Sequence, residues 1–104
     1  MSVSIYAPSR SGKSHHVLNM ANGNFCFVVR QLCLPMAYPG GEIMGDKILP
    51  HLGKAAVFFC ERYYTGDDGN LYCGISHDQA ARYIKRLRIA ALLSIKHGKP
   101  LYWG

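Results

Sequence analysis

The sequence predicts an α+β fold in which a small, mainly antiparallel sheet packs against a long C-terminal helix. Three observations carry this prediction. Residues 75–98 form the longest uninterrupted helical pattern in the chain. Residues 2–7 alternate in polarity and are β-rich, which is typical of a strand. Residues 54–75 hold two β-rich runs joined by a turn at Asp68-Gly69, which indicates a β-hairpin.

Length and composition favour a single compact domain over residues 1–104. Hydrophobic residues make up 49% of the chain and charged residues 17%, which is typical of a globular protein. No apolar run reaches the roughly 18 residues that a membrane span needs, and the N-terminus lacks the pattern of a signal peptide. We therefore expect a cytoplasmic protein with no membrane partner. The four cysteines lack zinc-ligand spacing, so we expect no metal site.

The net charge of +6 is distributed unevenly. Residues 1–41 contain three basic residues and no acidic one, and residues 79–104 contain six basic residues and no acidic one. All six acidic residues fall within 42–78. Basic ends of this kind favour a polyanion or an acidic protein surface as the partner, with improved solubility as the alternative reading.

A short motif containing glycine, lysine and serine follows the first predicted strand. Residues 7–14 read A-x-x-x-x-G-K-S and precede a helix-compatible stretch. The motif resembles the P-loop (Walker A) of nucleotide-binding proteins, with Ala7 where glycine is commoner. The resemblance implies that amides around Gly12 cradle phosphate, that Lys13 reaches it, and that Ser14 holds Mg²⁺ of a Mg-nucleotide cofactor. The alternative is a turn followed by a serine helix cap.

The middle of the chain is less regular. Residues 24–34 are apolar and are predicted to form a buried strand. Residues 35–41 contain two prolines and two glycines and are predicted to form a loop. Residues 42–52 are expected to hold a short helix interrupted by a proline. In the hairpin that follows, the strand register decides whether Cys60 lies opposite Cys73.

The C-terminal helix has clear boundaries in the sequence. Ser76 or Asp78 is expected to cap its start. Gly98 is expected to end it, because Pro100 prevents its continuation. Residues 101–104 carry the only tryptophan of the chain. We expect this tail to fold back as an anchor, with an exposed docking peptide as the alternative.

The faces of this helix differ along its length. At about 100° per residue, one side is predicted to face the core. That side comprises Ala80, Tyr83, Ile84, Leu87, Ala91 and Ile95. The predicted partner-binding surface mixes cations with apolar residues and comprises Arg82, Lys85, Arg86, Ile89, Leu92, Leu93 and Lys96. A mixed surface fits a protein interface better than phosphate tracking. The alternative is that the rest of the chain covers its apolar residues.

Motifs typical of enzymes are missing from the sequence. It contains no G-x-S-x-G, H-E-x-x-H or EF-hand pattern. The doublet His15-His16 has no carboxylate or nucleophile that can be placed beside it, and surface histidines are the simpler interpretation. We therefore expect a non-enzymatic binding protein.

The small size and the basic–apolar helix resemble, in general character, the small accessory proteins of bacteriophages, including inhibitors of host nucleases or defence complexes. The resemblance implies a partner that is a host protein complex acting on nucleic acid, or the nucleic acid itself. Two alternatives remain. One is a P-loop-type nucleotide-binding protein or reduced NTPase. The other is a protein that binds DNA or RNA directly. The oligomeric state stays open.

Overall fold

The computed structural model of the protein describes residues 2–53 and 77–104. The predicted hairpin at 54–75, with Cys60 and Cys73, lies outside these residues. Residues 49–53 are helical. The other elements, in chain order, are β1 (Ser2–Pro8), β2 (Ser14–Ala21), α1 (Asn22–Leu32), β3 (Gly41–Ile43), the 3₁₀ turn η1 (Gly45–Lys47), α3 (His77–His97) and β4 (Leu101–Trp103).

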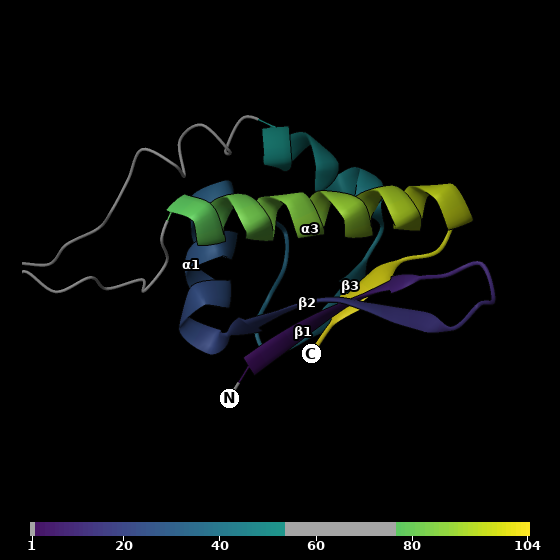
Figure 1. Cartoon of the computed structure of the whole chain (residues 1–104), viewed down its shortest axis with the longest axis horizontal. Coiled ribbons are helices and arrows are strands. Elements are labelled where there is room, and N and C mark those ends of the chain that lie inside the picture. Colours follow the sequence, from purple (N-terminus) through teal and green to yellow (C-terminus); the bar gives the residue numbers. More distant parts are fainter. Residues whose placement is uncertain (1, 54–76) are drawn as a thin grey trace, which may run out of the picture.

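The four strands form one sheet in the order β2-β1-β4-β3, and each neighbouring pair is antiparallel. Helix α3 lies along one side of this sheet (Figure 1). An antiparallel sheet packed against the C-terminal helix confirms the predicted α+β class. The C-terminal strand β4 lies inside the sheet, between β1 and β3. The tail is therefore an anchor, as expected, and its Leu101 and Trp103 side chains are buried.

The chain after Lys13 forms strand β2, so the helix expected there was wrong. Leu18 and Met20 are buried two residues apart, which is the spacing of a strand with one face on the core. The turn before β2 contains Gly12 at φ 80°. Its N–H donates to the carbonyl oxygen of Ser9 at 3.0 Å. Glycine adopts a positive φ without a steric penalty, so this residue reverses the chain into a hairpin.

Residues 24–34 were predicted to be a buried strand, and this was also wrong. Most of them belong to α1. The buried side chains of this helix are Phe25, Val28 and Leu32, which follow a helical spacing of three and four residues. The side chain of Cys26 is exposed between them. The apolar residues therefore form one stripe of a helix that packs on the sheet.

The core side of α3 matches the prediction over most of its length. Ala80, Tyr83, Ile84, Leu87 and Ala91 are all buried. Ile95 was expected to join them but is 44% exposed, while Ser94 is fully buried. In the last turns of α3, the side that faces the core is therefore centred on Ser94 and not, as predicted, on Ile95.

A hydrogen-bond relay explains this position. Residues 42–52 were expected to be an interrupted helix but form β3, then η1, then the start of a helix. Gly45 of η1 donates its N–H to Ser94 Oγ at 2.9 Å, and Ser94 Oγ donates to the carbonyl oxygen of Lys99 at 2.6 Å. One buried hydroxyl thus joins η1, α3 and the segment leading into β4. This relay holds Ser94, and not Ile95, against the core.

Candidate functional site

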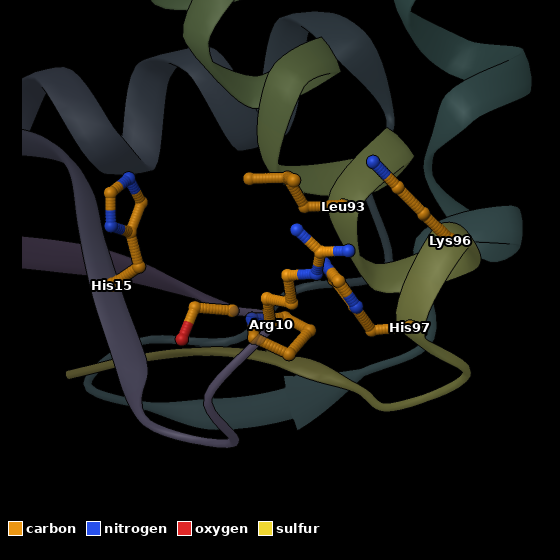
Figure 2. Close-up of a pocket in the computed structure, with 7 residues that line it drawn as sticks. Arg10, His15, Leu93, Lys96 and His97 are labelled. Carbon is orange, nitrogen blue, oxygen red and sulfur yellow. The ribbon is translucent and has the colours of Figure 1, made fainter.

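A pocket of about 410 Å³ lies between the β1–β2 hairpin and the last turns of α3 (Figure 2). The residues that line it are Pro8, Ser9, Arg10 and His15 from the hairpin and Leu93, Lys96 and His97 from α3. Four of these side chains carry or can acquire positive charge, and none of this described lining is acidic. The pocket is therefore suited to an anion.

The hairpin loop holds Arg10 in a defined position. Both the N–H and the Oγ of Ser9 donate to the carbonyl oxygen of Lys13, at 3.1 and 2.6 Å. These bonds close the loop that carries Arg10 between them. Figure 2 shows the Arg10 side chain extending from this loop toward α3, in the space between His15 and Lys96. A guanidinium in this place can make paired hydrogen bonds to a phosphate or carboxylate group.

A β-bulge determines which histidine enters the pocket. Tyr6 pairs with His16 and Ala7 with His15, and the register shift leaves Val17 as the extra residue of β2. Ala7 is buried on the side of the sheet that α3 covers. Because residues opposite each other in register share a face, His15 points toward α3 and His16 points away from it.

Lys96 and His97 lie at the C-terminal end of α3, where the helix dipole favours positive charge. Helix stability alone therefore accounts for these two residues. It does not account for Arg10, which comes from a different element and adds a further positive charge to the same space, beside the imidazole of His15. Positive charges that converge on a pocket whose described lining holds no acidic side chain repel one another, and a bound anion offsets that repulsion. This convergence favours a binding site over a purely structural arrangement.

The basic surface continues around the hairpin loop. The Nζ atom of Lys99 lies 3.8 Å from the position that a Cβ on Gly12 would occupy. Lys99 therefore reaches the same loop that carries Lys13 and Arg10. Cations from the two ends of the chain meet here, because β1 and β4 are neighbours in the sheet.

The structure divides the predicted partner-binding surface into two parts. The cations Arg82, Lys85, Arg86 and Lys96 are all exposed, as expected. Leu92 is 50% exposed, whereas Ile89 and Leu93 are half-buried. Leu93 packs against the core and also lines the pocket. Leu92 therefore belongs to the outer surface of α3, and Leu93 belongs to the pocket wall.

The three residues of the P-loop-like motif lie at the hairpin turn. Gly12, Lys13 and Ser14 are exposed. The Gly12 N–H is bonded to Ser9, and Ser14 accepts a hydrogen bond from the Tyr102 hydroxyl. A P-loop presents its amides to phosphate at the start of a helix, but a strand begins here. The expected strand–loop–helix context was therefore wrong. Mg-nucleotide binding by these residues stays a prediction, to be checked by a thermal shift with Mg²⁺-nucleotide.

The chain matches no family model, no curated protein and no solved structure. Across residues 2–53 and 77–104, no cluster of three or more His, Cys, Asp or Glu side chains could hold a metal ion. No helix in that part of the chain is long and apolar enough to cross a membrane.

The predicted site residues included Leu93 and Lys96 but not Arg10, His15 or His97. The only signal in the sequence for these three was the basic character of both chain ends. Their convergence depends on the hairpin lying beside the end of α3.

Proposed function

We propose that this chain is a small, cytoplasmic, non-enzymatic protein that binds nucleic acid and holds a backbone phosphate in the pocket between the hairpin and α3. The observation that carries the proposal is the convergence of Arg10, His15, Lys96 and His97 from two elements. Arginine and lysine side chains of this kind supply most of the affinity of proteins for nucleic acid.

The shape and walls of the pocket support a nucleotide unit over a bare inorganic anion. Its volume of about 410 Å³ exceeds the space that a single phosphate fills. Pro8 and Leu93 add apolar surface beside the cations, which suits the carbon atoms of a sugar. Lys13 and Lys99 lie around the adjacent loop and can contact neighbouring phosphates of the same strand.

The test is the affinity of the Arg10→Gln/Lys96→Gln double variant for labelled oligonucleotides, measured by fluorescence anisotropy. We expect a loss of about tenfold or more at moderate salt. We also expect the slope of log K against log salt to fall by about 1.4 for a single strand, because two phosphate contacts are removed.

The matched control is Arg82→Gln/Lys85→Gln, which removes the same charge from the other end of α3, where both residues are exposed. It should weaken binding by no more than about threefold, because only long-range attraction is lost. Equal losses in the two double variants would show that the pocket is not the site. Wild-type protein that binds no oligonucleotide would overturn the proposal.

A second candidate function is docking to a host protein complex that acts on nucleic acid, as a phage-type inhibitor or modulator would do. The observation in its favour is that Leu92 and Ile95 are 50% and 44% exposed on α3, among the exposed cations Lys85, Arg88 and Lys96. Apolar anchors with arginine around them are typical of protein interfaces.

The variant Arg86→Glu/Leu92→Asp tests this second candidate, because both side chains are exposed and their replacement should leave the fold intact. We expect the variant to lose a protein partner that the wild type captures from nuclease-treated host extract. Its affinity for oligonucleotides should stay within about threefold of wild type. Unfolding of the variant, seen by circular dichroism, would instead mean that Leu92 is part of the core.

A further inference from the structure

The side of the sheet that faces away from α3 carries a row of side chains across all four strands. In the strand register, His16 lies opposite Tyr6, Tyr6 opposite Tyr102, and Tyr102 opposite Glu42. The neighbours of these residues within β1 and β4 are buried on the other side: Ile5, Ala7, Leu101 and Trp103. Because strand side chains alternate between faces, the row points away from α3, which lies over the other side of the sheet (Figure 1).

The aromatic rings of this row are already ordered against one another. The Tyr6 and Tyr102 rings are stacked, with centroids 5.3 Å apart and planes 24° apart. The His16 ring meets Tyr6 edge-on, at 5.5 Å and 74°. Tyr102 also donates its hydroxyl to Ser14 Oγ. This bond spans from β4 to β2, and β1 lies between them.

The Tyr102 side chain therefore reaches across β1 toward β2. One side of its ring faces the stacked Tyr6 ring, and the 38% exposure of Tyr102 leaves part of its ring open to a ligand. A ring held in this way presents a flat aromatic surface without a further loss of side-chain freedom on binding.

Sheet stability is the simplest explanation for the tyrosine pair, since cross-strand aromatic pairs stabilise sheets. The rest of this face indicates more. Toward one end it is polar, where Asn19 donates to Ser2 Oγ and Ser4 Oγ at 3.0 and 2.9 Å. No large aliphatic side chain of the described row or its polar end joins the tyrosines. An apolar protein layer would find no matching surface, whereas a planar base with polar edges would.

The charged side chains around the two tyrosines would orient a ligand that is bound on this face. Lys13 lies in the loop that joins β1 to β2, and Lys99 reaches the same loop. Glu42, at the β3 edge, places a negative charge on the opposite side of Tyr102. A phosphate backbone is therefore attracted toward the hairpin loop and repelled from the β3 edge.

We infer that the open face of the sheet binds single-stranded nucleic acid by stacking an unpaired base on the Tyr102 ring, which the stacked Tyr6 ring supports from behind, with Lys13 and Lys99 holding the adjoining phosphates. The inference rests on the proposed nucleic-acid function and specifies its substrate. Bases within a duplex are already stacked and paired, so they cannot lie flat on this platform. A strand that leaves the tyrosines passes the hairpin loop and reaches the pocket on the other side.

The test compares oligothymidylate with a duplex of mixed sequence in anisotropy titrations. The Tyr6→Leu/Tyr102→Leu variant should bind the single strand about tenfold or more weakly, because base–aromatic stacking is lost. We expect wild-type protein to bind the duplex more weakly than the single strand, and the variant should bind the duplex with the same affinity as wild type. The Tyr6→Phe/Tyr102→Phe variant keeps both rings and should bind the single strand within about threefold of wild type. Circular dichroism melting checks that both variants fold.

The outcomes separate this inference from the proposed function. Leucine and phenylalanine variants with equal losses would assign the effect to the hydroxyls and overturn stacking. Wild-type preference for the duplex would overturn it as well. A leucine variant that binds the single strand like wild type, while Arg10→Gln/Lys96→Gln fails to bind, would overturn the inference and leave the pocket proposal standing. Wild-type protein that binds neither oligonucleotide would overturn both.

Discussion

Replacing Gly45 with alanine should lower the free energy of unfolding by about 3 kcal/mol or more, or prevent folding. A Cβ at this position would lie 2.1 Å from the carbonyl oxygen of Ala91 and 2.8 Å from its Cα. These are backbone atoms of α3, so relief requires the whole helix to move. That movement would also stretch the hydrogen bond from the Gly45 N–H to Ser94 Oγ. Urea denaturation followed by far-UV circular dichroism measures the loss.

Gly23→Ala provides the matched control. Gly23 lies in the first turn of α1, and a Cβ there would meet no described atom within 4 Å. Alanine is a better helix former than glycine, so this variant should keep or raise the stability by up to about 1 kcal/mol. If Gly45→Ala were as stable as Gly23→Ala, η1 and α3 could not be in direct backbone contact.

Trp103→Ala should lower the free energy of unfolding by about 3–5 kcal/mol, the range for removal of a large buried aromatic side chain. Trp103 is only 6% exposed. Its Nε1 donates to the carbonyl oxygen of Ala37 at 2.7 Å, so the ring also ties down the loop before β3. The ring lies so close to Gly41 that a Cβ there would be 2.9 Å from it. Loss of the ring therefore loosens β3 and β4 together.

The alternation within β4 supplies the comparison. Tyr102 is the exposed neighbour of Trp103. Tyr102→Ala should lower the free energy of unfolding by about 1 kcal/mol, since mainly a cross-strand pair is lost. Trp103→Phe should fall between the two, because a ring remains but the hydrogen bond to Ala37 does not. Trp103 is the only tryptophan, so circular dichroism must replace fluorescence as the probe. Equal losses for the two alanine variants would contradict the burial of Trp103.

Long, regular patterns in the sequence predicted their elements correctly. The strand at the N-terminus and the C-terminal helix each have a single periodicity, and Gly98 with φ 66° ends the helix where expected. Residues 24–34 were ambiguous because their apolar residues satisfy both spacings. Phe25, Phe27 and Val29 alternate as in a strand, whereas Phe25, Val28 and Leu32 form a helical stripe. Packing against the sheet favours the helix over the strand for these residues, and no local feature of the sequence indicates this packing.

The pocket could not be predicted from the sequence for a similar reason. Leu93 and Lys96 were predicted from the helix that carries them, but Arg10 and His15 join them only because a hairpin replaces the expected helix after Lys13. The tyrosine row depends on β4 entering the sheet beside β1, so it requires contact between the two ends of the chain. Convergence of this kind is a property of topology and leaves no local pattern.

The extra residue in β2 determines which histidine lies on the pocket side of the sheet and which lies on the tyrosine side. Counted from Leu18 in strict alternation, His16 would face α3 and His15 would face the tyrosines. The bulge at Val17 changes the parity of the strand, so that His15 lines the pocket and His16 meets Tyr6. The pairing register of β2 between Leu18 and the turn therefore matters as much as the identity of its residues. Loss of the bulge at the same chain length would exchange the two histidines between the faces of the sheet, whereas deletion of Val17 would restore strict alternation and leave each histidine on its present face.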